Sequence, residues 1–254
     1  MELCIVAIFK NEKHALKEWI DHYLREGVDR FFLVDNGSND GYDLKGYEDK
    51  VEVWINPKKH AQVELTNHYL QKAKKYQWVL VVDLDEFMYS RKPFKTIKDY
   101  LKWVKSDISQ IKVPWKLFGS SGHIKQPKSI IQGFTRRKKM EEQIIEVKSI
   151  VRGKSLLKLE IHFHKTHDKI PIRPDYNPSI EYEFISEKTL KTAFLHLNHY
   201  RIQSWDWYST VKKNRGSANV KVYDKKHTKK YFKQHDTNEV LDTELKRKTR
   251  KNIK

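Results

Sequence analysis

One short stretch of the sequence limits the possible folds more than any other. Five consecutive apolar residues, Trp78 to Val82, run directly into the acidic segment Asp83-Leu84-Asp85-Glu86. An apolar run of this length is typical of a strand buried on both faces, as in a parallel sheet that helices cover on both sides. Three carboxylates at the exit of such a strand are costly unless they lie in a cleft with a cation. We therefore expect an α/β fold with a cation-binding cleft at this end of the sheet.

The chemistry of the acidic segment indicates the kind of ligand. In open α/β sheets, ligands bind at the carboxyl ends of the strands. Carboxylate oxygens there suit Mg²⁺ or Mn²⁺, and these ions commonly carry the phosphates of a substrate. The pattern favours an enzyme that handles a nucleoside diphosphate. The alternative is a solvated acidic turn that follows a strand.

Length and cysteine content exclude several classes of protein. A chain of 254 residues fits one large α/β domain with a sizeable core. Cys4 is the only cysteine, which excludes disulfides and cysteine-based zinc sites within the chain. No stretch approaches the roughly 20 apolar residues that span a bilayer. Because strand-like sequence begins at Glu2, we expect no signal peptide or membrane stem, and a cytoplasmic location.

The formal net charge of +18 allows more than one kind of partner. From Lys221 to Lys254 there are twelve Lys or Arg against five Asp or Glu, and the run Arg136 to Lys139 is the densest in the body. Such a charge can attract nucleic acid, anionic lipid or anionic substrates, or it can simply be a soluble basic surface. We expect residues 218–254 to form a basic tail, helical or partly disordered, that can touch an anionic membrane.

Hydrophobic periodicity predicts the order of the elements. In the first half we expect strands at 2–9, 30–34, 51–55 and 78–82, with a helix that Asn11 caps and Gly27 ends, and a second helix that buries Leu65, Tyr69, Ala73 and Tyr76. Residues 35–41 have the composition of a turn. In the second half we expect strands at 109–117, 144–151, 156–163 and 194–200, and a helix from about 204 to 215. The first half reads as a doubly wound, mostly parallel unit.

Six segments, in this order along the chain, resemble glycosyltransferases of the GT-A type, most closely glycosyltransferase family 92 and its bacterial and viral relatives. The segments are Phe9 to Glu12 with Glu18-Trp19-Ile20, Val34 to Asp40, Trp78 to Phe87, Trp115 to His123, Lys148 to Arg152, and Asn198-His199-Tyr200 through Arg215-Gly216. The last motif often carries a lysine where this chain has Gln203. The resemblance ends near Ser217 and leaves the basic tail uncovered.

The resemblance implies a fold and a reaction. The fold would be a Rossmann-like, mostly parallel sheet with helices on both faces, in a single domain over residues 1–217. Its nucleotide-binding half would be 1–88, and its mixed, acceptor-side half 89–217. The reaction would be metal-dependent transfer of a sugar from a nucleoside diphosphate, UDP, to a hydroxyl of a glycan or lipid-linked acceptor, with inversion. Asp83, Asp85 and His199 would hold Mn²⁺ or Mg²⁺, which stabilises the charge of the departing diphosphate.

The resemblance also assigns residues to the donor nucleotide. Asp35 matches the position that hydrogen-bonds the nucleobase, although a turn-initiating aspartate is an equally common use. Asn11 and Glu12 open the first helix, where they can help to hold the nucleotide or serve only as a helix cap. Lys213 and Arg215 match basic residues near the diphosphate, and Asp83 can also touch the ribose.

For the acceptor side we expect Trp115, Phe118, Gly119, Ser120 and Ser121, because aromatic faces suit sugar C–H surfaces and small residues allow close approach. Core packing is the alternative for Trp115.

An inverting transfer needs a base near the acceptor hydroxyl. Asp206, Glu86 and His123 are the candidates, and the sequence does not choose between them. The spacing of His162 and His164 is compatible with zinc, but no carboxylate or cysteine partner can be placed beside them.

A nucleic-acid-processing enzyme or nucleic-acid-binding module is the alternative to a transferase, because basic runs alternate with aromatic residues. An acidic cleft without metal repels phosphates, which makes nucleic acid the less favoured partner.

Overall fold

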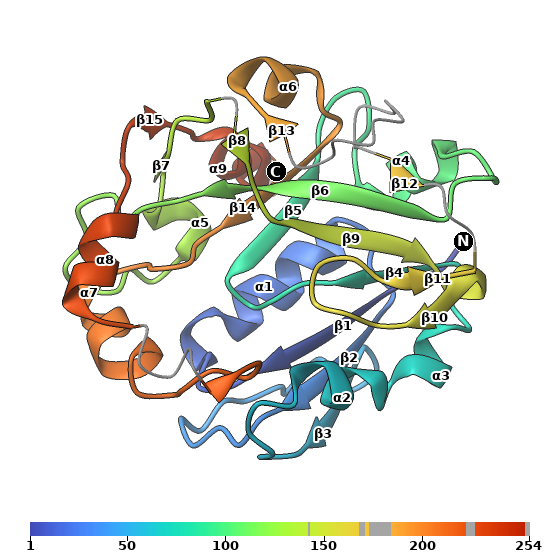
Figure 1. Ribbon diagram of the computed structural model, residues 1–254, viewed down its shortest axis with the longest axis horizontal. Coiled ribbons are helices and arrows are strands. Elements are labelled where there is room, and N and C mark those ends of the chain that lie inside the picture. The colour runs from blue at the N-terminus through green and yellow to red at the C-terminus, as the bar shows by residue number, and fades with distance from the viewer. Residues whose placement is uncertain (142, 168–170, 173–183, 222–226, 252–254) are drawn as a thin grey trace.

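The computed structural model describes residues 1–141, 143–167, 171–172, 184–221 and 227–251 (Figure 1). Its strands are β1 (Leu3–Phe9), β2 (Arg30–Asp35), β3 (Val51–Ile55), β4 (Trp78–Val81), β5 (Glu86–Ser90), β6 (Gln110–Leu117), β7 (Arg136–Arg137), β8 (Gln143–Ile144), β9 (Val147–Arg152), β10 (Leu156–Lys158), β11 (Lys165–Thr166), β12 (Pro171–Ile172), β13 (Phe184–Ile185), β14 (Leu195–His199) and β15 (Val240–Leu241). Its helices are α1 (Lys13–Arg25), α2 (Gln62–Asn67), α3 (Leu70–Ala73), α4 (Ile97–Trp103), α5 (Ile130–Gly133), α6 (Glu187–Thr192), α7 (Trp205–Trp207), α8 (Lys229–His235) and α9 (Glu244–Lys251), with a 3₁₀ turn η1 (Gly153–Ser155) and a π-helical turn η2 (Tyr208–Lys212).

One large, mostly parallel sheet organises the molecule. Its strand order is β3-β2-β1-β4-β9-β6-β14-β5, and β12 pairs with β6. β9 is antiparallel to both of its neighbours and β5 is antiparallel to β14, whereas the other neighbouring strands are parallel. The sheet runs without a break through both halves that the sequence suggested. This architecture confirms the expected α/β class with a mostly parallel sheet.

The first strand supplies side chains to two separate hydrophobic cores. Leu3, Ile5, Ala7 and Phe9 of β1 point into one core, and Cys4, Val6 and Ile8 point into the other. This alternation follows from the two-residue period of a strand. Helix α1 covers the first core, while α2 and α3 cover the second (Figure 1). The continuous apolar runs of the sequence therefore do mark strands with helices on both faces.

Two local predictions were wrong at their ends. Asn11 does not cap α1: its φ is 55°, Glu12 occupies the cap position, and the Asn11 Oδ1 accepts a hydrogen bond from the Asn39 N–H instead. The strand predicted at 156–163 ends at Lys158. It ends there because the Asn67 side chain bonds both the N–H and the C=O of Leu159, which removes these groups from strand pairing.

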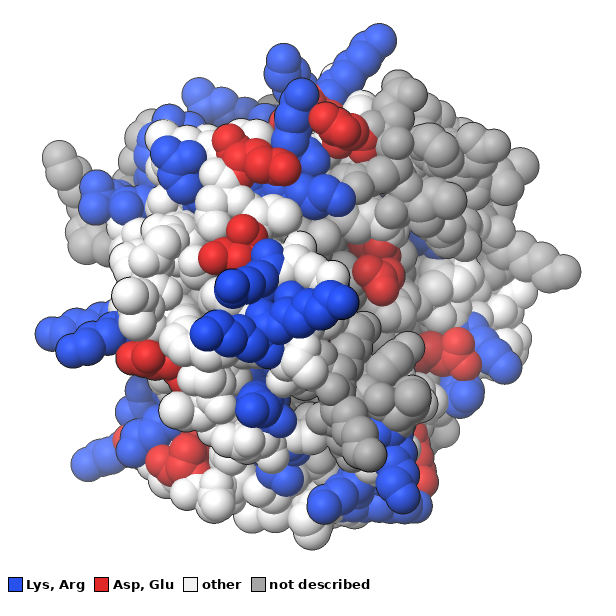
Figure 2. All heavy atoms as spheres, turned by 60° about the vertical axis from the view of Figure 1, so that its left-hand side comes forward, with Lys and Arg blue, Asp and Glu red and all other residues white. Residues whose placement is uncertain are grey.

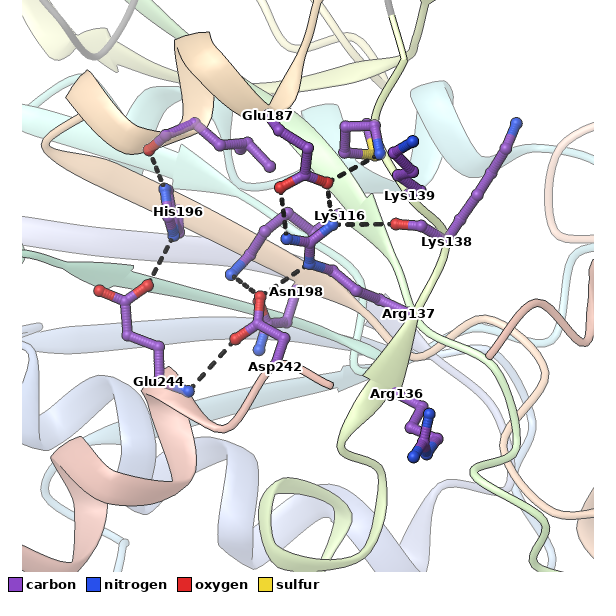
Figure 3. A network of polar contacts seen from close by, with 12 residues as sticks. Lys116, Arg136, Arg137, Lys138, Lys139, Glu187, His196, Asn198, Asp242 and Glu244 are labelled. Carbon is purple, nitrogen blue, oxygen red and sulfur yellow. Dashed lines mark hydrogen bonds and ion pairs between the residues drawn. The ribbon is translucent and has the colours of Figure 1, made fainter. Parts of the chain in front are cut away.

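Residues 228–251 pack into the domain. β15 pairs with β7, and Leu245 of α9 is 2% exposed in the larger core. Asp242, next to β15, accepts hydrogen bonds from the buried Lys116 Nζ (2.9 Å) and from the Arg137 Nε (2.8 Å) (Figure 3). Glu244 pairs with Arg91 at 2.7 Å. These ion pairs explain why a strongly basic segment is ordered here, since its few carboxylates neutralise cations of the body.

In the part of the chain that the structure describes, no helix is both long and apolar enough to cross a membrane.

Candidate active site

A cleft of about 290 Å³ lies at the carboxyl ends of β1, β4 and β14. The acidic segment after β4 forms its floor, with Asp83 and Asp85 among the lining residues. Trp115 and Glu146 lie on one wall, at the end of β6 and the start of β9. The segment from Lys212 to Ala218, together with Tyr231 of α8, supplies other lining residues. The position agrees with the general rule for ligand sites in open α/β sheets.

Asp85 is buried and carries two partners, one on each carboxylate oxygen. Its Oδ2 accepts a hydrogen bond from the Lys212 Nζ at 2.8 Å, and its Oδ1 lies 3.6 Å from the His199 Nε2. Burial would raise the pKa of Asp85, but the charges of Lys212 and His199 outweigh it and hold the pKa well below the usual carboxyl value. Asp85 is therefore a carboxylate in the cleft.

Lys148 holds the other two carboxyl groups of the acidic segment. This lysine is fully buried, and its Nζ lies 2.9 Å from the Asp83 Oδ2 and 3.6 Å from the Glu86 Oε2. Burial raises the pKa of Glu86 well above the usual value; Lys148 opposes this effect, and Asp83 and Asp85 add to it. Glu86 also accepts a hydrogen bond from the Asp83 N–H. Glu86 thus fixes the loop from beneath and does not line the cleft.

Half-buried Arg215 and buried Glu12 form an ion pair, and both line the cleft. The guanidinium also donates to the Lys10 carbonyl. Burial lowers the pKa of Arg215, but the charge of Glu12 and its hydrogen bond more than compensate, so that the pKa lies above the usual arginine value. Arg215, which the family resemblance assigned to the diphosphate, is therefore a fixed cation of the cleft lining.

The remaining predicted donor residues lie around the cleft without all entering it. Lys213 is exposed, and it is Lys212 that lines the cleft. Asp35 is buried and accepts hydrogen bonds from the Ser38 N–H and the Tyr42 hydroxyl; its neighbour Asn36 lines the cleft. Asn11 lies outside the lining and joins the turn through Ser38 and Asn39.

Of the predicted acceptor residues, the structure brings only Trp115 to the cleft. Phe118 is buried, and the Ser120 N–H and hydroxyl both bond Asp236. The Ser121 N–H donates to Asn238, and a Cβ on Gly119 would lie 2.5 Å from Asn238 and from the Thr237 carbonyl. The loop is thus covered by residues 236–238.

The three candidate bases also lie away from the cleft. Glu86 is buried beneath the acidic loop, as described above. Asp206 is exposed in the first turn of α7. The His123 ring bonds the Gly133 carbonyl and packs against Phe134. None of the three lines the cleft.

Among the cleft-lining residues that sequence reasoning missed are Lys212, Tyr231 and Glu146. Glu146 is exposed and lines the cleft next to Trp115, whose backbone N–H donates to the Glu146 carbonyl at 3.1 Å. Among the described residues, none forms a hydrogen bond or ion pair with its carboxylate. No local signal distinguishes Glu146 from Glu141 and Glu142, which lie just before it in the sequence.

Asp85 and His199 fit a divalent ion. In the described part of the chain, no group of three or more His, Cys, Asp or Glu could hold a metal ion by itself. His162 and His164 therefore belong to no such group. A carboxylate and an imidazole suit Mn²⁺, however, and ions that bind nucleotides take their other ligands from phosphates and water. The His199 Nε2 and the Asp85 Oδ1 already face each other at 3.6 Å.

The chain resembles proteins of known family. A family model described as glycosyltransferase family 92 matches residues 1–248. A family 92 protein of Oryza sativa subsp. japonica is 28% identical over 234 residues, which cover 87% of this chain and 36% of that protein. One of Arabidopsis thaliana is 26% identical over 230 residues, with 82% and 36% covered. The chain thus spans about a third of the length of these relatives.

Solved structures resemble the chain only weakly. Residues 1–349 of TarS from S. aureus share 15% identity at a TM-score of 0.39, with 92% of this chain and 72% of that one covered. A glucosyl-3-phosphoglycerate synthase from Mycobacterium tuberculosis, in complex with Mn²⁺ and UDP-glucose, shares 18% identity at a TM-score of 0.29, with 45% and 44% covered.

Proposed function

This chain belongs to glycosyltransferase family 92, and from that premise we propose that its cleft transfers a sugar from a nucleoside diphosphate, UDP, to a hydroxyl of a glycan or lipid-linked acceptor. The observation that carries the proposal is the pairing of Asp85 with His199 in a cleft that also holds Lys212 and Arg215. Carboxylate and imidazole ligands together with fixed cations are what a bound diphosphate and its ion require.

Asp85 and His199 would hold Mn²⁺ or Mg²⁺, and the bound ion would stabilise the negative charge of the leaving diphosphate. Asp83 lines the same cleft and its side chain is 34% exposed, although Lys148 holds its Oδ2 at 2.9 Å and the Gln62 Nε2 donates to its Oδ1 at 3.4 Å. Arg215, held in place by Glu12, offers a second positive charge to the phosphates. Asn36 and Gln62 line the same cleft; their Nδ2 and Nε2 groups already donate to the Asn56 and Lys58 carbonyls and to Asp83, so their amide oxygens are what they can offer the nucleotide.

Glu146 is the base that we propose for the acceptor. The carboxylates that line the cleft are Glu12, Asp83, Asp85 and Glu146, and the first three are engaged with Arg215, Lys148 and Lys212. Of these four side chains, only the Glu146 carboxylate forms no hydrogen bond or ion pair with a described residue. Its carboxylate takes the proton of the acceptor hydroxyl, whose oxygen bonds the anomeric carbon as the bond from that carbon to the diphosphate oxygen breaks. The electron pair of the broken bond leaves with the diphosphate.

Trp115 supports the sugar next to this base. Its side chain is 6% exposed and lines the cleft, and its indole N–H has no hydrogen-bond partner among the described residues. A buried donor without a partner is costly, so a ligand hydroxyl that accepts from it gains the full hydrogen bond.

Calorimetric titration of UDP in the presence of Mn²⁺ tests the proposal. Wild-type protein should bind, and Asp85→Ala should lose the Mn²⁺-dependent part of the affinity. Asp43→Ala removes an exposed carboxylate that is paired with Lys17 outside the cleft, and it should leave binding unchanged. Absence of UDP binding, or equal binding by Asp85→Ala, would refute the proposal. A panel of nucleotide sugars, assayed for Mn²⁺-dependent hydrolysis, then identifies the donor.

Nucleic acid is the alternative ligand that the charge suggests. On the face shown in Figure 2, Lys and Arg side chains are numerous, but Asp and Glu lie between them rather than leaving an unbroken basic stripe. A salt titration of DNA or RNA affinity decides the matter, since submicromolar binding at physiological salt with a steep dependence on salt favours this alternative. The cytoplasmic location and the contact of the basic tail with anionic membrane stay predictions.

A further inference from the structure

Lys212 occupies an unusual position in the cleft. It is the last residue of the π-helical turn η2, a conformation that is rare and frequent at functional sites. Its side chain is 9% exposed, whereas that of the next residue, Lys213, is exposed. The Lys212 Nζ donates to the Asp85 Oδ2 and to the Arg201 carbonyl. The chain thus directs one of two adjacent lysines into the cleft, onto the carboxylate that is proposed to bind the ion.

The ammonium group and a divalent ion would compete for the same carboxylate. Asp85 offers two oxygens, of which one faces His199 and the other accepts from Lys212. A buried carboxylate without a counter-charge is strongly unfavourable, so the empty cleft needs Lys212 at this place. Once a doubly charged ion binds Asp85, an ammonium group 2.8 Å from the same carboxylate is repelled.

From this geometry we infer that Lys212 is an exchangeable counter-cation, which neutralises Asp85 in the empty cleft and moves onto the donor diphosphate when the ion binds. The inference rests on the proposed function. A lysine suits the exchange because its ammonium is a compact charge on a flexible stem of four carbons. Both positions lie in one cleft, so the side chain alone has to move.

Two other cations of the site, Arg215 and Lys148, are less able to make this move. Arg215 is bonded to Glu12 and to the Lys10 carbonyl. If Arg215 moved away, the only other described cation near Glu12 would be His14, whose Nε2 lies 3.9 Å from the carboxylate. Lys148 is fully buried and bonded to Asp83, and it does not line the cleft. Of these three cations, only Lys212 both contacts the metal-binding carboxylate and lines the cavity.

Titration of Mn²⁺ without nucleotide, followed by electron paramagnetic resonance, tests the first half of the exchange. Lys212→Met removes the competitor and should bind Mn²⁺ roughly tenfold more tightly than wild type, which is the factor for a hydrogen bond to a charged group. Lys213→Met is the matched control and should leave Mn²⁺ affinity unchanged. Equal or weaker Mn²⁺ binding by Lys212→Met would overturn the inference.

Titration of UDP at saturating Mn²⁺ tests the second half. Lys212→Met should bind UDP roughly tenfold more weakly, because the diphosphate loses one charged donor, whereas Lys213→Met should bind as wild type does. A loss of UDP affinity in Lys213→Met instead of Lys212→Met overturns the inference. The inference is also overturned if wild-type UDP affinity is the same in EDTA as in Mn²⁺ and Lys212→Met abolishes UDP binding. In that case the lysine would replace the ion permanently.

Two further measurements keep the outcome clear. Thermal unfolding reports whether each variant is folded. If Lys212→Met does not fold, Lys212→Gln replaces it in both titrations, because the glutamine amide can still donate to Asp85. A crystal of the wild type soaked with Mn²⁺ and UDP should show the Lys212 Nζ on a phosphate oxygen; finding it still on Asp85 overturns the inference. If the wild type binds neither Mn²⁺ nor UDP, the proposed function itself fails, which is a different result from any of these.

Discussion

Asp242 offers the most direct test of how the C-terminal segment is held. One carboxylate, 9% exposed, serves both the fully buried Lys116 and the Arg137 guanidinium, at 2.9 and 2.8 Å. Burial would raise the pKa of Asp242, but the two cations hold it well below the usual range, so the charge is fully present at neutral pH. Asp242→Asn keeps the shape and removes that charge.

The expected cost follows from what is left behind. Lys116 would keep only the Tyr89 hydroxyl at 2.8 Å as a close partner, while Arg137 would keep Glu187. Removing one partner of a buried ion pair typically costs about 3–5 kcal/mol. For a domain of this size that corresponds to a fall in Tm of roughly 6–20 °C.

Urea and thermal unfolding at pH 7 measure this cost. Glu64→Gln is the control, because Glu64 pairs with Lys58 on the surface, where both side chains are more than half exposed. Such a pair contributes less than about 1 kcal/mol. If the free energy of unfolding of Asp242→Asn differs from that of wild type by less than about 1 kcal/mol, the ion pairs shown in Figure 3 do not hold the segment, and the reasoning is refuted.

Three other predictions concern the cleft and the core. Glu146→Gln should slow Mn²⁺-dependent hydrolysis of the donor by about 10²–10⁴-fold with UDP affinity unchanged, as expected for a general base; an unchanged rate excludes Glu146 from that role. Trp115→Phe keeps the ring but loses the indole N–H, so KM for the donor or acceptor sugar should rise about threefold to tenfold in steady-state assays, and an unchanged KM would mean that no sugar hydroxyl uses this donor. His22 is buried, and burial lowers its pKa to about 3. Because the unfolded chain takes up a proton below about pH 6.5 and the folded chain does not until about pH 3, His22 should remove about 2 kcal/mol of stability between pH 7.5 and pH 5. Urea unfolding of His22→Asn at the two pH values should show a smaller difference than wild type; an identical difference would contradict the assignment.

The sequence predicted those parts of the fold that depend on local pattern. Strands β1, β2 and β4 lie where continuous apolar runs placed them, because residues buried on both faces leave a continuous signal. Strands β3, β6 and β14 also lie where they were predicted, although polar residues interrupt their apolar ones. The acidic loop after β4 reaches the cleft for the same reason, since its position at the strand end is local. The pairing of Asp85 with His199 joins residues far apart in the chain, and only the family resemblance, not any local pattern, had brought them together.

The parts that were not predicted depend on contacts over long sequence separations. Nothing near Lys116 indicates that Asp242 will neutralise it, so residues 218–254 were expected to form a basic tail, helical or partly disordered. The family model, in contrast, extends to residue 248. The loop at Phe118 to Ser121 looked accessible because the segment that covers it lies more than 100 residues away. Lys213 was expected near the diphosphate from the family resemblance, and no local pattern reveals the π-helical turn that brings Lys212 to the cleft.

The shared carboxylate of Asp242 also bears on the order of folding. Its two cations lie 126 and 105 positions earlier in the chain, on β6 and β7. Until Asp242 docks, Lys116 in the large sheet has no carboxylate partner, so neither β6 nor β7 can complete its native contacts. Contacts of such long range slow folding. Docking of this segment should therefore be a late event in refolding, and Tyr231, which lines the cleft, comes from the segment just before it.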